Sequence, residues 1–189
     1  MGRPKASLIL EGQTMLARQV RLLGRVAGRV AVLGFRPEYL EDLGVPFISD
    51  ELPGRGPLGG IYTGLLRTRT EYNLFLGCDL PFANRQLLAY LARRAIEAEA
   101  DATVPRSRDG RLQTLCAVYR RRARRAVRAS LGAGENKLRS FFPKVNCQVI
   151  PWRDLARAGF LPSIFDNMNT SADYESARRR LEPSAMRTA

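Results

Sequence analysis

The stretch that decides the fold is Tyr72-Asn73-Leu74-Phe75-Leu76-Gly77-Cys78-Asp79-Leu80-Pro81. Its apolar run from Tyr72 to Gly77 predicts a buried strand, Pro81 ends the extended segment, and a helical pattern follows from Gln86 to Ala98. In open α/β sheets, ligands bind outside the carboxyl ends of the strands. Asp79 is therefore a candidate ligand-binding carboxylate, and capping of the next helix or a plain turn is an equally good explanation.

Short apolar runs alternate with helical patterns along the whole chain, which predicts a layered α/β fold with a mostly parallel sheet. The expected strands are Ser7–Leu10, Val30–Leu33, Phe47–Ser49, Tyr72–Gly77, Ala102–Val104, Leu115–Tyr119 and Cys147–Ile150. The expected helices are Thr14–Val26, Leu58–Thr68, Gln86–Ala98, Arg122–Leu131 and Ala172–Leu181. At 189 residues the chain fits one domain, predicted over residues 1–182, with a frayed tail at 183–189.

Composition excludes several classes of protein. The sequence contains no histidine, which removes Ser-His-Asp and Cys-His catalysis and histidine metal sites. Cys78, Cys116 and Cys147 lie far apart and favour neither a disulfide framework nor a zinc knuckle, so we expect a cytoplasmic protein. No apolar run approaches the roughly 18 residues of a membrane span. Phosphoryl or nucleotidyl transfer, which needs little proton transfer, remains compatible.

The formal net charge of +13 raises the possibility of a nucleic-acid partner. The basic residues are dispersed over most expected helices, which favours solvated surface, and we do not expect nucleic-acid binding. The exception is a group of arginines expected on one helix, which could attract a polyanionic substrate. This group consists of Arg120, Arg121, Arg122, Arg124, Arg125 and Arg128.

Three features in chain order supply the parts that hold a nucleoside triphosphate and a divalent metal. They are the amine of Lys5, the helix start at Gly56-Pro57-Leu58-Gly59-Gly60, and the carboxylate of Asp79, which suits Mg²⁺. Residues 54–59 also match the dinucleotide fingerprint G-x-G-x-x-G. We treat that match as accidental, because residues 50–53 separate it from the preceding strand.

Near the end of the chain, Thr170 and Asp173 form a capping box. Asn167 and Asn169, just before it, have the spacing that puts two side chains on one side of an extended segment. Either these asparagines are polar turn residues, or their amides face a ligand.

Taken in order, these pieces resemble the molybdenum cofactor guanylyltransferase family, whose members transfer GMP from GTP to the terminal phosphate of molybdopterin. That family opens with a strand and the pattern L-A-G-G-x-S-x-R-M-G-x-x-K, of which this chain has M-G-x-x-K at residues 1–5. The further matches are Leu8–Gly12, Arg36-Pro37-Glu38, Ile48-Ser49-Asp50, Gly56-Pro57-Leu58-Gly59-Gly60-Ile61, Cys78-Asp79-Leu80-Pro81-Phe82, Leu115-Cys116-Ala117-Val118-Tyr119 and Asn167-Met168-Asn169-Thr170. The resemblance covers nearly the whole chain.

The resemblance implies a Rossmann-like three-layer nucleotidyltransferase fold from which the first central strand is missing. It also implies that Lys5 contacts the triphosphate, Asp50 recognises the guanine or its nucleoside, and Gly60 lines the base pocket. Asp79 would bind Mg²⁺ and act with Lys5 in catalysis. Asn167 and Asn169 match positions that face the cofactor side of the cleft.

The chain departs from the family pattern in two places, which affect the expected choice of base and the expected activity. Some members have an asparagine after the second strand, where this chain has Val32-Leu33-Gly34-Phe35, so the choice of base is open. The first strand and its L-A-G-G loop do not precede Met1, which would expose the edges of two neighbouring strands. We therefore expect the chain as given to be inactive or poorly folded, and in-frame translation of the upstream DNA tests for a late start.

GTP and molybdopterin are the expected partners, and we expect a monomer or a weak oligomer. A cytidylyltransferase or a sugar-phosphate nucleotidyltransferase of the same fold is the alternative enzyme. From other classes, a basic nucleic-acid-binding module predicts binding that depends steeply on salt. A truncated non-catalytic remnant predicts no stabilisation by nucleotides.

Overall fold

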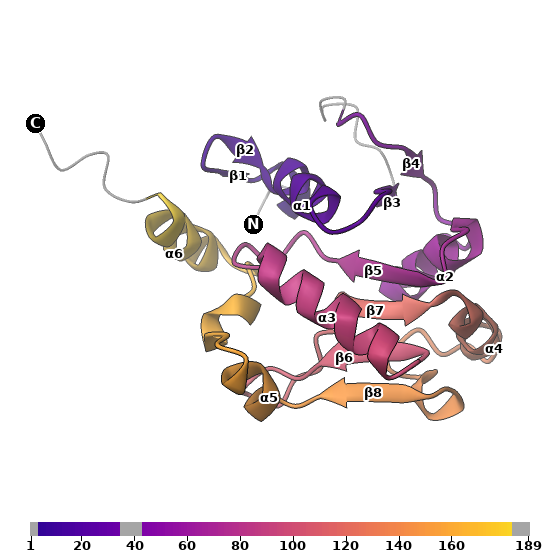
Figure 1. The fold of residues 1–189 in the computed structure, drawn as a ribbon. Coiled ribbons are helices and arrows are strands. Elements are labelled where there is room, and N and C mark those ends of the chain that lie inside the picture. The colour runs from indigo at the N-terminus through magenta and orange to yellow at the C-terminus, as the bar shows by residue number, and fades with distance from the viewer. Residues whose placement is uncertain (1–3, 35–42, 183–189) are drawn as a thin grey trace, which may run out of the picture.

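The computed structural model describes residues 4–34 and 43–182, and Figure 1 shows its elements. The main sheet has the strand order β5-β7-β6-β8, and β3 and β4 form a separate two-stranded sheet. The strands are β1 (Ile9–Leu10), β2 (Gln13–Thr14), β3 (Val32–Leu33), β4 (Phe47–Ile48), β5 (Tyr72–Leu76), β6 (Ala102–Pro105), β7 (Cys116–Arg120) and β8 (Cys147–Ile150). The helices are α1 (Met15–Gly24), α2 (Gly56–Arg67), α3 (Arg85–Glu97), α4 (Arg124–Gly132), α5 (Trp152–Arg157) and α6 (Ser171–Leu181).

Strand direction differs from the prediction in one place. The pairs β3–β4 and β6–β8 are parallel, as expected, but β7 is antiparallel to both β5 and β6. The segment between β6 and β7 contains no helix, and a parallel neighbour would need a helical crossover. The sheet is therefore mixed rather than mostly parallel, while the α/β class is confirmed.

Helices cover both faces of the main sheet, which gives three layers (Figure 1). Along β7, Ala117 and Tyr119 join the core cluster that α2 and α4 build, while Cys116 and Val118 join the cluster of α3 and α5. This alternation is the period-two pattern of a strand whose two faces are both covered. The apolar run that predicts β7 from the sequence reflects this double burial.

The two ends of the described chain pack together. Leu10 and Met15 from the N-terminal part form one buried cluster with Met168 and Ala177 from the C-terminal part. The predicted strand at Ser7–Leu10 is shorter in the structure, because residues 5–7 form a 3-10 turn. This packing brings the start of the chain to the segment that precedes α6.

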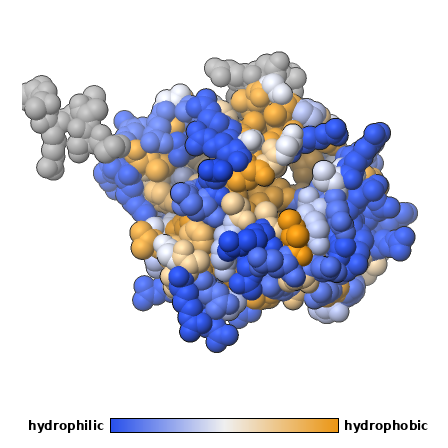
Figure 2. Space-filling model, viewed as in Figure 1, coloured by the Kyte–Doolittle hydropathy of each residue, from blue (hydrophilic) through white to orange (hydrophobic). Residues whose placement is uncertain are grey.

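A groove of about 660 Å³ separates the two sheets. Residues 29–33 line one side of it and residues 73–78 the other, so the facing edges of β3 and β5 both border the groove. Within residues 4–34 and 43–182, no strand pairs with either of these edges across the gap. In Figure 2 hydrophobic residues are visible inside this hollow.

Several predictions concern residues that the structure does not describe. The matches at residues 1–3 and at Arg36-Pro37-Glu38, Phe35, and the predicted frayed tail at 183–189 lie outside the described residues. The extent of the domain, residues 1–182, stays a prediction. Among the described helices, none is long and apolar enough to cross a membrane.

Candidate active site

Three polar side chains from distant parts of the chain meet at the carboxyl end of β5. The Lys5 ammonium donates a hydrogen bond to Asn169 Oδ1 at 2.6 Å, and it lies 3.8 Å from Asp79 Oδ2. The Lys5 side chain is 38% exposed and that of Asp79 29% exposed, so both are open to a ligand from solvent. The structure thus brings together the predicted amine and the predicted carboxylate.

The backbone around Asp79 fixes where its carboxylate lies. Asp79 follows β5 directly, and its carbonyl accepts a hydrogen bond from the Met168 N–H at 2.9 Å. A Cβ atom at Gly77 would come within 2.7 Å of Asp79 Oδ1, so only glycine leaves room for this orientation. The helix that follows, α3, is capped by Asn84, whose side chain accepts from the Leu87 N–H at 2.9 Å. The capping explanation for Asp79 is therefore wrong.

Asp173 orders the segment that carries Asn169. Its Oδ2 accepts hydrogen bonds from the backbone N–H groups of Asn169, at 3.0 Å, and Thr170, at 2.8 Å. These backbone hydrogen bonds, with smaller help from the charge of Lys5, lower the pKa of Asp173. The predicted capping box is confirmed, because the Thr170 side chain accepts from the Asp173 N–H. The same carboxylate thus caps α6 and holds the partner of Lys5.

The groove between the sheets begins beside this cluster. Gly77 and Cys78, which directly precede Asp79, line it together with Asp50 and Gly60. A Cβ at Gly60 would lie 3.8 Å from Asp50 Oδ1, so these two residues face each other across a narrow space. The apolar walls and one carboxylate make this groove suitable for a flat ring with hydrogen-bond donors on its edge.

Burial raises the pKa of the Cys78 thiol, which lines this groove. The pKa of Cys78 is raised to about 11, mainly because the thiol is removed from water and secondarily because Asp79 carries negative charge nearby. Cys78 therefore stays protonated at neutral pH and is not an activated nucleophile. Cys78 therefore contributes to the wall of the groove and not to chemistry.

The remaining predicted residue, Asn167, is half-buried and lies two positions before Asn169. Within the described ranges, the structure gives its side chain no hydrogen bond to Lys5, Asp79 or Asn169. The geometry therefore groups the predicted residues in two sets, Lys5, Asp79 and Asn169 in the polar cluster and Asp50 and Gly60 in the groove. Asn167 flanks the first set.

The donor atoms of the polar cluster fit a hard divalent cation. Asp79 offers carboxylate oxygens and Asn169 an amide oxygen, and oxygen donors are what Mg²⁺ prefers. In the described part of the chain, no group of three or more His, Cys, Asp or Glu side chains could hold a metal ion. A bound Mg²⁺ would thus depend on Asp79 together with oxygens of the ligand, as in many phosphate-transfer sites.

Sequence reasoning missed two supporting residues. Gln19 of α1 is buried, and its side-chain amide donates to the carbonyl of Leu80 at 2.9 Å, beside Asp79. Nothing in the sequence distinguishes this glutamine from a surface residue of an amphipathic helix. Asp173 was recognised as a cap, but its bond to the Asn169 N–H depends on a backbone path that spacing alone does not reveal.

Comparison with known proteins identifies the family. The profile of the MobA-like NTP transferase domain matches residues 1–149. The chain belongs to this family. A "probable molybdenum cofactor guanylyltransferase" of Pelotomaculum thermopropionicum is 32% identical over 184 residues, which cover 97% of this chain and 88% of that protein. A protein of the same name from Mycobacterium tuberculosis is 38% identical over 144 residues, covering 73% and 70%.

Solved structures of two proteins share the fold of this MobA-like domain. Molybdopterin-guanine dinucleotide biosynthesis protein A of Archaeoglobus fulgidus aligns with a TM-score of 0.77 and 21% identity, covering 94% of this chain and 90% of that one. 2-C-methyl-D-erythritol 4-phosphate cytidylyltransferase of Thermus thermophilus aligns with a TM-score of 0.70 and 19% identity, covering 93% and 92%. At these identities the likeness concerns the fold, and it confirms the predicted nucleotidyltransferase architecture.

Proposed function

We propose that this protein is a molybdenum cofactor guanylyltransferase, which transfers GMP from GTP to the terminal phosphate of molybdopterin and releases pyrophosphate. The observation that carries the proposal is the meeting of Lys5, Asp79 and Asn169 at the mouth of a groove that also contains Asp50 and Gly60. The names of the family relatives point to the same reaction.

In this proposal Lys5 binds the triphosphate and stabilises the negative charge that develops on the departing pyrophosphate. Asn169 holds the ammonium in place through the 2.6 Å hydrogen bond. Asp79, together with phosphate oxygens of the ligand, would hold Mg²⁺, which supplies further positive charge against the phosphates when bound. The attacking phosphate of molybdopterin is already ionised, so no general base is required, in keeping with a sequence without histidine.

The groove would receive the base. Asp50 offers a carboxylate that accepts two hydrogen bonds, and the edge of guanine presents two neighbouring N–H donors, at N1 and N2. Gly60, opposite Asp50, leaves the space that a flat ring needs. Cytosine has a single exocyclic amino donor on its corresponding edge, so Asp50 favours GTP over CTP. Asn167 and Asn169 lie where the proposal places the acceptor.

A cytidylyltransferase is the second candidate. It is supported by the structural likeness to the Thermus thermophilus cytidylyltransferase. A cytidylyltransferase that acts on the same acceptor would differ from the first candidate in the base that enters the groove. We also propose that the enzyme acts in the cytoplasm. The proposed substrate, GTP, is a cytoplasmic metabolite, and the three cysteines of the described chain are unpaired, as expected in a reducing compartment.

The test combines binding and turnover. Thermal stabilisation is measured with GTP, CTP, ATP and UTP in the presence of Mg²⁺, and molybdopterin is then incubated with each stabilising nucleotide while pyrophosphate release is followed. Both the 189-residue chain and the protein translated from the in-frame DNA directly upstream of Met1 are assayed. The proposal predicts stabilisation by GTP and formation of a guanine dinucleotide in at least one of the two proteins. Stabilisation by CTP alone, or no effect of any nucleotide on either protein, overturns it.

An Asp50→Asn variant tests the assignment of the base. An amide can accept only one of the two hydrogen bonds and presents a donor to the other N–H group, so GTP binding should weaken about tenfold or more. CTP binding should change far less. Equal losses for both nucleotides would show that Asp50 does not read the base.

A further inference from the structure

A second concave surface lies away from the candidate active site, and arginine side chains form most of it. This arginine pocket has a volume of about 350 Å³. Its lining residues are Arg69, Glu71, Arg120, Arg121, Arg122, Arg124 and Arg125. The sequence predicts such a group on one helix. The structure corrects this, because the group spans the end of β7, a 3-10 turn and the first turn of α4.

The arginine pocket lies at the opposite edge of the sheet from Asp79. In the antiparallel pair β5–β7, Tyr72 lies across from Arg120 and Leu76 lies across from Cys116. Asp79 follows the Leu76 end, whereas the arginine pocket borders the Tyr72 end. A ligand bound among these arginines is therefore a strand's length away from Asp79, and Arg69 is the lining residue that the arginine pocket shares with the far end of the groove.

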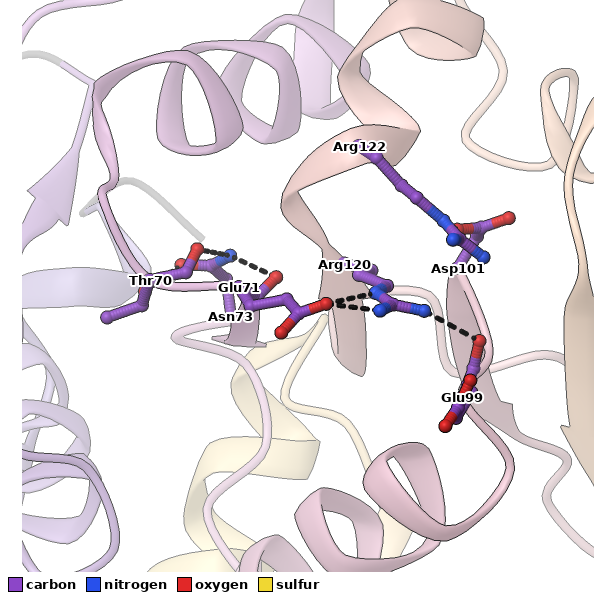
Figure 3. A network of polar contacts seen from close by, with 7 residues as sticks. All are labelled: Thr70, Glu71, Asn73, Glu99, Asp101, Arg120 and Arg122. Carbon is purple, nitrogen blue, oxygen red and sulfur yellow. Dashed lines mark hydrogen bonds and ion pairs between the residues drawn. The ribbon is translucent and has the colours of Figure 1, made fainter.

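Acidic residues neutralise only part of the charge in the arginine pocket. The Arg120 guanidinium pairs with Glu71 and donates to the Glu99 carbonyl at 3.2 Å, and Arg122 pairs with Asp101 (Figure 3). In the part of the chain that the structure describes, the other four arginines have no acidic partner. These four are Arg69, Arg121, Arg124 and Arg125.

Two local features make the unpaired charge unfavourable without a ligand. Arg124 and Arg125 occupy the first turn of α4, which contains no acidic residue, and positive charge is disfavoured at the positive end of the helix dipole. In addition, Arg121 Nε is buried and has no hydrogen-bond partner among the described atoms. Such an orphaned donor costs stability, and conflicts of this kind are expected mainly at functional sites. A bound anion would offset the positive charge at the start of α4.

We propose that the arginine pocket binds a small diphosphate-bearing anion. Phosphate oxygens match the forked donors of guanidinium groups, and the volume suits a compact ligand rather than a polymer. The lining described above contains no aromatic side chain on which a nucleic-acid base could stack. Inorganic pyrophosphate and the phosphates of a nucleoside diphosphate share this chemistry. The proposal does not depend on the function proposed for the Asp79 site.

The experiment titrates the 189-residue chain with pyrophosphate, ADP and a short single-stranded oligonucleotide by calorimetry, without Mg²⁺ and at constant ionic strength. Arg124→Gln/Arg125→Gln removes two arginines of the arginine pocket that do not line the groove. The matched control, Arg108→Gln/Arg139→Gln, removes the same charge from two exposed positions outside it. A Lys5→Ala variant reports binding at the candidate active site. Protection of Arg121 and Arg124 from modification by phenylglyoxal locates the ligand.

The proposal predicts saturable pyrophosphate binding that persists in Lys5→Ala and in the control. Binding should weaken about tenfold or more in the Arg124→Gln/Arg125→Gln variant, and in the parent protein the ligand should protect Arg121 and Arg124. Tighter binding of ADP than of pyrophosphate would identify a nucleotide as the source and also supports the site. Equal affinities in the two double variants, loss of all binding in Lys5→Ala, or no saturable binding overturns the proposal. So does an oligonucleotide that binds these arginines more tightly than either small anion.

Discussion

The ammonium group of Lys5 lies 2.6 Å from the side-chain oxygen of Asn169, a residue 164 positions further along the chain. The same ammonium is 3.8 Å from the carboxylate of Asp79. Packing of Leu10 and Met15 against Met168 and Ala177 makes this meeting possible. The polar cluster is therefore a product of the tertiary fold, and its parts respond to substitutions that never touch a ligand directly.

A methyl group at position 77 should displace the carboxylate of Asp79. In Gly77→Ala the new Cβ would lie 2.7 Å from Asp79 Oδ1, and the carboxylate, at the end of a flexible side chain, would have to turn away. We expect a change of less than about 1 kcal/mol in the free energy of unfolding, with Mg²⁺-dependent GTP binding about tenfold weaker. Calorimetry and denaturant unfolding measure the two. The control is Gly132→Ala, where a Cβ meets nothing within 4 Å; equal binding by both variants would contradict the stated role of Gly77.

Two substitutions in the capping box of Thr170 and Asp173 separate capping of α6 from the positioning of Asn169. Thr170→Ala removes the bond from the Asp173 N–H but leaves the Asp173 carboxylate on the Asn169 N–H. Asp173→Ala removes the carboxylate that accepts from the Asn169 and Thr170 N–H groups, but keeps the backbone N–H at position 173 that donates to Thr170. Thr170→Ala should cost about 1 kcal/mol of stability. Asp173→Ala should also destabilise the fold, and it alone should weaken GTP binding. If both variants bind GTP as tightly as the parent protein, Asp173 has no positioning role.

The Asp173 contribution also predicts a pH dependence. Because the pKa of Asp173 is lowered in the folded protein, its stabilisation is present above the ordinary aspartate pKa and is lost as the pH falls through the lower folded value. The difference in stability between the parent protein and Asp173→Ala should therefore shrink on acidification below about pH 4. Unfolding by denaturant at a series of pH values provides the check.

Two glycines of α2 should respond to alanine in opposite ways. At Gly64 a Cβ would lie 2.8 Å from the Phe75 ring and 3.0 Å from Leu33, so Gly64→Ala should destabilise the fold by about 1–3 kcal/mol. At Gly60 a Cβ meets only Asp50 Oδ1, at 3.8 Å. Gly60→Ala should raise the stability by up to about 1 kcal/mol and weaken GTP binding, because the methyl group narrows the groove. Unchanged GTP affinity in Gly60→Ala would place the base elsewhere.

Alkaline pH should destabilise the fold through its buried thiols. Burial raises the pKa of Cys116 to about 12, with a smaller contribution from the charge of Asp79. The unfolded thiol ionises near its ordinary pKa of about 9, so the stabilisation is complete below that pH and is lost as the pH rises toward 12. Cys116→Ala should lose stability less steeply between pH 9 and 11, by about 1.4 kcal/mol per pH unit. Parallel curves for the two proteins would rule this out.

The sequence predicts the strands of the main sheet well, because each is a short apolar run bounded by turn or helix signals. The apolar runs of β5, β7 and β8 lie within one residue of the predicted strands, and Asp79 was found because a strand end in an α/β sheet faces ligands. Strand direction was harder to predict, because the antiparallel course of β7 follows from a connection without a helix. The short helix α5 was missed, since one and a half turns carry too little periodicity to recognise.

In the candidate site, too, some residues can be predicted from the sequence and others cannot. Lys5, Asp79 and Asn169 were each identified by type and by order in the chain, and the fold brings them together. Gln19 was not identified, because its bond to the Leu80 carbonyl depends on how α1 packs over the end of β5. A polar residue on a helix gives no sign of such a partner until the helix is placed.

The most direct test of the account is a double-mutant cycle of Lys5→Ala and Asp79→Ala, with the dissociation constant of GTP measured in the presence of Mg²⁺. The measurement is made on whichever of the 189-residue chain and its in-frame extension binds GTP. If Lys5 and Asp79 act on the same bound triphosphate, each single change weakens binding about tenfold or more, and the double change costs less than the sum of the two free energies by over about 0.5 kcal/mol. Strictly additive losses, or GTP binding that neither change affects, would contradict the claim that these two groups form one nucleotide site.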